Sequence, residues 1–195
     1  MSLLTNKLPT TIAIKGVEYP VKTDFRVFIE FEMIIFGESI TVETIVKLFR
    51  LCFDGEIPPV DEASIDALIK FYAGGKEPKA SNEMAEKSYF YDHDDSYIYA
   101  AFLDQYNIDL QMVEHMHWWK FRSLFMSLKE DNEISKIMGY RTFKPSAKTP
   151  LEMRKFYAKM KELYEPPKSE SEEDERKAAN DWVKSFSRGG EPVEK

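Results

Sequence analysis

The chain of 195 residues is 43% hydrophobic and 14% aromatic, so it can bury a core of its own and is not a fully disordered protein. Its formal net charge of −7 argues against binding to a nucleic-acid backbone or an anionic membrane, because both need clustered Lys and Arg side chains. The single cysteine, Cys52, lies in an apolar run, where we expect a buried thiol in a reducing cytoplasm. The first residues do not resemble a secretion signal, and no apolar run is long enough to cross a bilayer, so we expect neither secretion nor membrane insertion.

The first elements are predicted to be a β-hairpin and a helix. Branched residues alternate on both sides of Lys15-Gly16 within residues 11–22, which is typical of a short hairpin, and Pro20 fits only at an edge. Because an isolated hairpin is marginally stable, it must pack against helices. Asp24 then provides an N-cap for a helix that Gly37 is expected to end as a left-handed C-cap.

Two more helices are predicted in the first half of the chain. One begins after Thr41 and carries apolar residues at helical spacing as far as Cys52. The other begins after Asp61 and stops at Gly74-Gly75. The residues from about 75 to 88 are polar and predict an exposed, mobile connection between two halves of the helical body.

The second half of the body is predicted to contain four helices. The acidic residues from Asp92 to Asp95 suit the positive end of a helix dipole, so we expect them to cap the first of these helices. The predicted ranges are 96–106, 110–128, 133–138 with a stop at Gly139, and 151–164.

The composition changes after the last predicted helix. Pro166-Pro167 blocks its continuation, and the acidic residues that follow cannot bury enough apolar surface to become ordered. We therefore predict a mostly disordered tail over residues 166–195, in which Trp182 and Phe186 belong to a short amphipathic helix that forms on meeting a partner. The predicted fold is mainly α: a small helical bundle over residues 1–165 with one N-terminal β-hairpin, followed by this tail.

No pattern in the sequence predicts catalysis or a cofactor. His115 and His117 would point to different sides of a helix, so one metal ion would not reach both. The loop from Asp92 to Ser96 begins like a calcium loop but lacks the glycine and the final Glu that such a loop needs. A metal-dependent phosphohydrolase would need more histidines than His93 and these two. We expect a protein that is not an enzyme and that holds no metal or cofactor.

Residues 117–125 are rich in aromatic side chains, with Lys and Arg between them. On a helix, Trp118 shares a face with the Phe residues of this run, whereas Trp119 points nearer to the other side. A core role is favoured for Trp118, while core and interface are equally open for Trp119, because Trp and Arg are common anchors of interfaces. The residues predicted to bind a partner, including two from the tail, are Trp118, Trp119, Phe121, Arg122, Phe125, Trp182 and Phe186.

Several stretches of the chain resemble one family of phage proteins. They are residues 92–110, 117–121 and 139–142, together with the opening residues 4–10 and the hairpin and helix start at 17–26. In these stretches the chain resembles the Gp-fifteen family of siphophages and prophages of Gram-positive bacteria. The resemblance covers residues 3–165, and its most specific part is the sequence His-Trp-Trp-Lys-Phe that begins at His117.

The resemblance implies a role in tail morphogenesis. Members of the family are encoded next to the tape-measure gene and are regarded as tail assembly chaperones, so the implied partner is the tape-measure protein. The tail tube protein is a second expected partner, to which the acidic tail offers a contact. Such a chaperone would cover apolar stripes of the tape-measure protein in the host cell cytoplasm, without a nucleotide. The alternative is a minor structural component that stays in the virion, and a homo-oligomer is compatible with the sequence.

Overall fold

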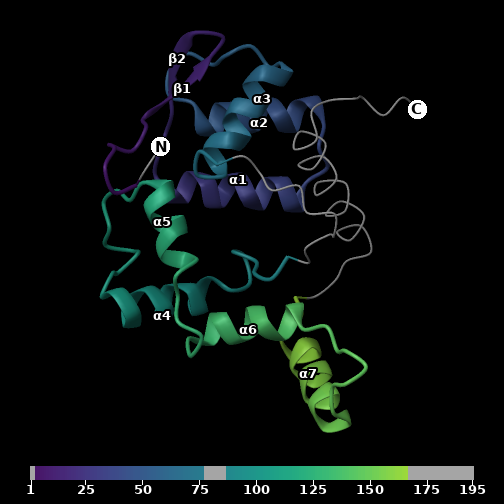
Figure 1. The fold of residues 1–195 in the computed structure, drawn as a ribbon. Helices are drawn as coiled ribbons and strands as arrows, with labels where there is room; N and C mark the ends of the chain where they lie inside the picture. Colours follow the sequence, from purple (N-terminus) through teal and green to yellow (C-terminus); the bar gives the residue numbers. More distant parts are fainter. Residues whose placement is uncertain (1–2, 77–86, 167–195) are drawn as a thin grey trace, which may run out of the picture. The chain divides into compact units, whose positions relative to one another are not determined.

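A computed structural model describes residues 3–76 and 87–166 of the chain (Figure 1). In chain order, the elements within these ranges are β1 (Thr11–Ile14), β2 (Val17–Pro20), α1 (Phe25–Gly37), α2 (Val42–Cys52), α3 (Glu62–Tyr72), α4 (Asp95–Tyr106), α5 (Trp118–Phe125), α6 (Glu133–Thr142) and α7 (Leu151–Tyr164). The predicted mainly α fold with one N-terminal β-hairpin is confirmed. Most of the predicted mobile connection, and all but the first residue of the predicted tail, lie outside the described residues.

The described residues form two compact units. Residues 3–76 and 115–123 belong to unit 1, and residues 87–114 and 124–166 belong to unit 2. Unit 1 contains the hairpin, α1, α2, α3 and most of α5, whereas unit 2 contains α4, α6 and α7. Each unit is therefore built from two stretches that are separated in the sequence.

The β-hairpin of unit 1 is closed by the turn that the sequence predicts. Its strands are antiparallel, with Ile12 opposite Tyr19. Lys15 and Gly16 at the turn have φ angles of 50° and 84°, and two consecutive residues with positive φ are typical of tight turns that match the twist of the strands. The side chains of Ile12 and Ile14 are buried and β1 packs against α3, so a helix covers the hairpin as its marginal stability requires.

Side-chain caps fix the starts of the three helices that follow the hairpin. Asp24, Thr41 and Asp61 accept hydrogen bonds from backbone N–H groups in the first turns of α1, α2 and α3. The end of α1 differs from the prediction, because Gly37 is the last helical residue and has no positive φ. The left-handed cap at Gly37 is therefore wrong. Glu38 is extended, and its N–H already bonds to a carbonyl in the last turn, so no left-handed residue is needed.

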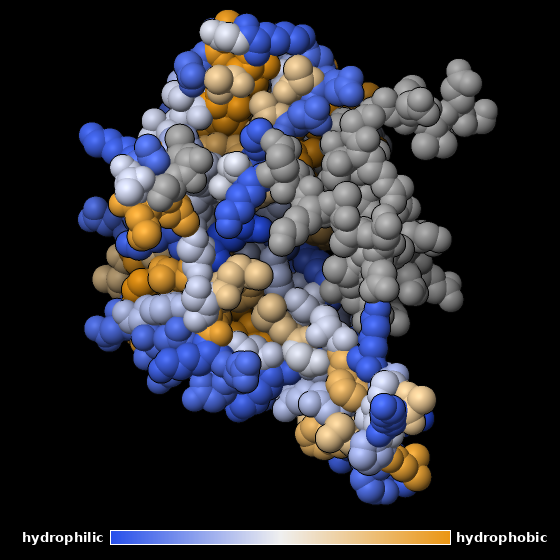
Figure 2. Space-filling model, in the orientation of Figure 1, coloured by the Kyte–Doolittle hydropathy of each residue, from blue (hydrophilic) through white to orange (hydrophobic). Residues whose placement is uncertain are grey.

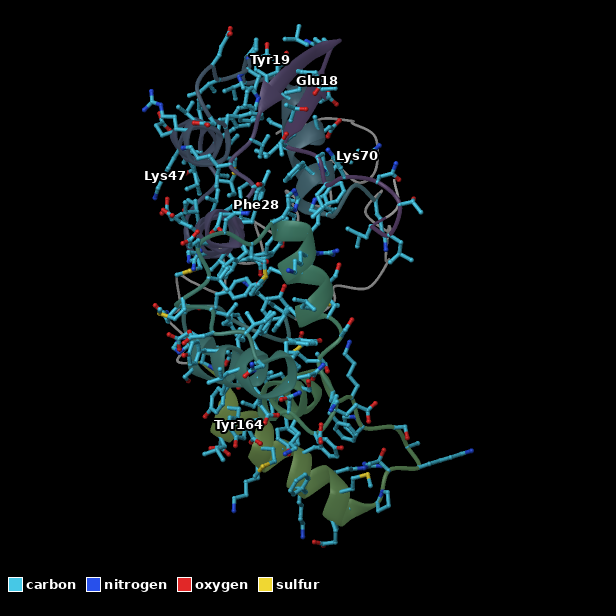
Figure 3. All side chains as sticks on the ribbon, turned by 90° about the vertical axis from the view of Figure 1, so that its left-hand side faces the viewer. Glu18, Tyr19, Phe28, Lys47, Lys70 and Tyr164 are labelled. Carbon is cyan, nitrogen blue, oxygen red and sulfur yellow. The ribbon has the colours of Figure 1, made fainter. Side chains whose placement is uncertain are left out.

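Aromatic side chains fill the core of unit 1. Phe28 on α1, labelled in Figure 3, is completely buried, and its ring stacks against those of Phe71 and Trp118 at centroid distances of 5.3 and 5.6 Å. The ring of Tyr72 also stacks with that of Trp118, at 5.6 Å, and its hydroxyl donates a 2.6 Å hydrogen bond to the buried carboxylate of Glu32. Residues from α1, α3 and α5 therefore meet in one core.

A buried ion pair links α4 and α6 in unit 2. Arg141 Nη2 donates to Asp94 Oδ1 at 2.9 Å, and both residues are buried. The same guanidinium donates to the carbonyls of Ser88 and Tyr164, and the Asp94 carboxylate also accepts from the backbone N–H of Phe90. Asp94 is at the N-cap of α4 and Asp95 is in its first turn, where the sequence predicts acidic residues, but the side chain of Asp94 makes no cap hydrogen bond and is instead engaged by these two partners.

The helix predicted over residues 110–128 is much shorter in the structure, where only α5 is helical. The residues after Asp109 form a turn instead, and those at 116–118 bond through their backbone to residues 23–25, with N···O distances of 2.7 and 2.8 Å. The prediction fails here because helical spacing of side chains does not reveal that the backbone groups are taken by a distant segment.

The structure also corrects the end predicted for the next helix. α6 does not stop at Gly139 but continues to Thr142. One interior glycine costs a helix only about 1 kcal/mol relative to alanine. Continuation places Arg141 on α6, where it reaches Asp94.

Candidate partner-binding site

Both tryptophans of α5 are buried in unit 1. Trp118 and Trp119 are 1% and 6% exposed. Their indole N–H groups donate to the backbone carbonyls of Tyr72 and Phe71, at 2.8 and 2.7 Å. These carbonyls belong to the last turn of α3, where the donors of the next helical turn are missing, although that of Phe71 also accepts from the N–H of Gly74 at 2.9 Å. The two indoles therefore pack in the core and also satisfy the end of another helix.

Two glycines after α3 make room for Trp119. Gly74 and Gly75 have φ angles of 80° and 74°. A Cβ atom at Gly75 would lie 2.7 Å from Cη2 of Trp119, whereas one at Gly74 would lie 3.4 Å from the flexible guanidinium of Arg122. Arg122, which is half-buried, donates from Nη1 to the carbonyl of Ala73 at 3.3 Å. The glycine pair predicted as a helix stop thus also allows the close approach of α5.

The structure does not bring the other predicted site residues together on one surface. Phe121 is buried in unit 1, where its ring stacks on that of Phe25 at 4.7 Å. Phe125 is buried in unit 2 against the ring of Tyr89, at 4.9 Å. The remaining two, Trp182 and Phe186, lie outside the described residues. In this arrangement the aromatic residues of α5 stabilise the fold, and partner binding by them stays a prediction.

The helical placement predicted for His115 and His117 is wrong, because both lie in the segment before α5. Nδ1 of His117 accepts from the backbone N–H of Trp119 at 3.0 Å, so Nε2 carries the proton and donates to the carbonyl of Pro9 at 2.9 Å. Burial lowers the pKa of His117, which keeps it neutral. Nε2 of His115 lies 3.0 Å from the hydroxyl of Thr23. Across residues 3–76 and 87–166, no group of three or more His, Cys, Asp or Glu is placed to hold a metal ion.

α7 packs against α6 through one edge only. The ring of Tyr157 stacks on that of Phe143 at a centroid distance of 3.7 Å, and Tyr164, labelled in Figure 3, stacks on Tyr140 at 5.9 Å. The hydroxyl of Tyr164 also donates to the carboxylate of Glu133 at 3.1 Å. The ring of Phe156 also meets that of Tyr140 edge-on, at 6.0 Å. None of the residues of α7 is fully buried, so the helix is attached along this one side in the described part of the chain.

Next to these tyrosines α7 carries an apolar face, in which Met153, Phe156 and Leu163 are exposed and Met160 is half-buried. Phe156 and Leu163 are 49% and 65% exposed. Figure 2 shows hydrophobic side chains at the surface where Figure 1 draws α7. The sequence predicts an amphipathic helix here, but helical spacing does not show whether the apolar side meets a core. The spacing of three, four and three residues identifies the apolar line itself, whereas its exposure is known only from the structure.

These features define a mainly α-helical protein with an uncovered apolar face on its last described helix. Residues 4–165 match the family model described as Bacteriophage Gp15 protein. The chain therefore belongs to this family of bacteriophage proteins, as its resemblance implies. Neither a comparison with curated proteins nor one with solved structures finds a match. None of the described helices has the length and apolar composition needed to cross a membrane.

Proposed function

We propose that this phage protein is a tail assembly chaperone that holds the tape-measure protein until the tail tube forms around it. The observation that carries the proposal is the uncovered apolar face of α7 in a member of a bacteriophage family. A tape-measure protein is a long helix-forming chain whose apolar stripes are exposed before assembly and prone to aggregation. An apolar helix face can cover such a stripe, because amphipathic helices bind one another through their apolar sides.

The proposed activity is binding and release, without a chemical step. Covering an apolar stripe stabilises the complex by roughly 25 cal/mol for each Å² of apolar surface removed from water, and this gain is lost again when tube subunits replace the chaperone. The protein is accordingly proposed to be a binding protein, not an enzyme, and to act in the host cell cytoplasm. The tail tube protein is its second proposed partner.

Co-expression with the tape-measure protein of the same phage tests the proposal. We expect the tape-measure protein to aggregate when it is made alone and to be recovered in a soluble complex when both proteins are made. An unrelated acidic helical protein made at the same level is the control, and it should not rescue the tape-measure protein. Recovery of soluble tape-measure protein to the same extent in all three cases would contradict the proposal.

A minor structural component of the virion is the second candidate. The same exposed face of α7 favours it, because a neighbouring tail subunit could cover this face permanently. Mass spectrometry of purified particles separates the two candidates. A chaperone should be missing or present in trace amounts, whereas a stoichiometric amount in the virion would establish the structural role.

A further inference from the structure

The apolar face of α7 is a continuous line of side chains. Met153, Phe156, Met160 and Leu163 follow one another at intervals of three, four and three residues, so they form one line about 15 Å long. We call these four residues the α7 seam. Three of them are exposed and Met160 is half-buried. A helix that covers the seam therefore removes apolar surface from water.

The C-terminal end of α7 is fixed, and it determines where the rest of the chain starts. The carbonyl of Tyr164 accepts two hydrogen bonds from the buried guanidinium of Arg141, at 2.6 and 3.0 Å. Leu163, the last residue of the seam, directly precedes Tyr164. Residues 167–195 therefore start at one end of the seam.

A second apolar face is present in the sequence of residues 176–188. Its five apolar residues are Ala178, Ala179, Trp182, Val183 and Phe186, and the eight others are polar. At about 100° per residue, the five would fall within an arc of about 140° on a helix, and the polar residues would fill the remainder. From Ala178 to Phe186 such a helix would be about 12 Å long, so it matches the length of the seam.

The short connection between the two faces favours this segment over any separate molecule. Residues 165–177 join the seam to Ala178, and a disordered chain of this length, as the sequence predicts here, spans about 20 Å. Such a tether gives an effective concentration on the order of 1 mM, which a second copy or another protein would have to reach to compete on equal terms. One Trp and one Phe side chain, each of which buries about 150–250 Å², can supply the weak affinity that docking then needs.

Charge does not decide between the possible occupants. The side of α7 opposite its tyrosines carries Lys155 and Lys159 but also Glu152 and Glu162, so the charges on this side cancel. The preference for the chain's own segment follows from its proximity and from its apolar face.

We propose that residues 178–186 form a helix that docks on the α7 seam of the same chain in the free protein. The docking goes beyond the proposed function and does not depend on it. One consequence rests on that function: a tape-measure helix that binds the seam has to displace the chain's own segment, so the two compete for one surface. The docked segment keeps the seam covered until the tape-measure protein is present.

Thiol reactivity in the full-length chain tests the docking. Burial raises the pKa of the Cys52 thiol, so the parent chain provides a nearly silent background for a maleimide reagent. Leu163→Cys, in the seam, should react at least tenfold faster when Trp182→Ser and Phe186→Ser are added. Leu151→Cys is the matched control, because Leu151 is as exposed as Leu163, at 64% against 65%, and lies on the side of α7 away from the seam. The rate of Leu151→Cys should not change.

A control pair of substitutions and a dilution series identify what covers the seam. Asn180→Ser with Lys184→Ser changes the polar side of the same segment and should leave the rate of Leu163→Cys unchanged. Protection by the chain's own segment should not depend on protein concentration, whereas protection that is lost on dilution would mean that a second copy covers the seam and would overturn the proposal. A rate of Leu163→Cys that Trp182→Ser and Phe186→Ser do not alter would overturn it as well.

Affinity for tape-measure fragments separates the docking from the proposed function. Trp182→Ser with Phe186→Ser should raise this affinity by about the factor by which it accelerates Leu163→Cys, because both depend on the fraction of chains with an open seam. If neither the wild-type chain nor the variant binds a fragment while the seam thiol is protected, the proposed function fails and the docking stands. If protection is relieved but the affinity is unchanged, the docking stands and competition at the seam is overturned.

Discussion

Replacing Gly75 with alanine should destabilise unit 1 through a clash that Gly74 does not share. Both glycines have positive φ, where alanine costs roughly 1–2 kcal/mol. At Gly75 the new Cβ would also lie 2.7 Å from Cη2 of the buried Trp119, and overpacking of this kind costs about 1–3 kcal/mol. At Gly74 it meets only the end of the flexible Arg122 side chain, at 3.4 Å. The free energy of unfolding should therefore fall by roughly 2–5 kcal/mol for Gly75→Ala and by only about 1–2 kcal/mol for Gly74→Ala.

A second substitution separates the clash from the cost of the backbone conformation. Trp119→Phe removes the outer ring of the indole, so Gly75→Ala in that background should cost no more than Gly74→Ala does. Trp119→Phe alone should cost about 1–3 kcal/mol, because a buried ring becomes smaller and the carbonyl of Phe71 loses one of its two donors, keeping the N–H of Gly74. Urea denaturation followed by far-UV circular dichroism measures all four variants. Equal losses for Gly74→Ala and Gly75→Ala, or an unchanged cost of Gly75→Ala in the Trp119→Phe background, would refute the reasoning.

The buried polar and aromatic groups lead to three more expectations. Trp118→Ala and Trp119→Ala should each lower the free energy of unfolding by about 3–5 kcal/mol; an unchanged melting temperature for Trp119→Ala would place that indole outside the core. Stability should fall as the pH decreases below about 6.5, because His117 is neutral in the folded state and gains a proton on unfolding. His117→Gln should flatten this slope in urea denaturation at several pH values, by at most about 1.4 kcal/mol per pH unit, and an unchanged slope would mean that His117 does not contribute to it. Asp94→Asn should cost about 3–5 kcal/mol because it leaves the Arg141 cation buried without a carboxylate; adding Arg141→Met should recover part of this loss, and a double-mutant cycle with additive losses would show that the pair is not coupled.

The hairpin turn and the starts of the first helices can be predicted from the sequence. The hairpin turn at Lys15-Gly16 needs two residues with positive φ, and glycine at the second position supplies one of them at no steric cost. The starts of α2 and α3 follow from Thr41 and Asp61, whose side chains accept hydrogen bonds from N–H groups that the first turn of a helix leaves without a partner. These features depend on neighbouring residues alone, so propensity and capping rules predict them.

The failed predictions depend on partners that are distant in the sequence. α5 begins only at Trp118, because the backbone of residues 116–118 bonds to residues 23–25. The side chain of Asp94 makes no cap hydrogen bond, because Arg141 engages it. Prediction of the candidate site from the sequence fails for the same reason, because burial depends on distant residues. Residue spacing predicts that α7 is amphipathic, and it leaves core and interface equally open for Trp119. Only the tertiary structure shows that Trp119 is buried and that much of the apolar side of α7 is exposed.

The interleaving of the two units along the chain constrains how the protein can be made. The core of unit 1 includes Trp118, which reaches the ribosome exit only after the residues at 87–114 that belong to the other unit. A nascent chain that ends at residue 76 therefore has α1 and α3 but no indole between Phe28 and Tyr72, and the carbonyl of Tyr72 lacks its indole donor. Unit 1 cannot complete its fold during translation until the segment at 115–123 has emerged. Fragments cut between residues 76 and 87 should accordingly be poor folding units, although that position separates helices that pack in different units.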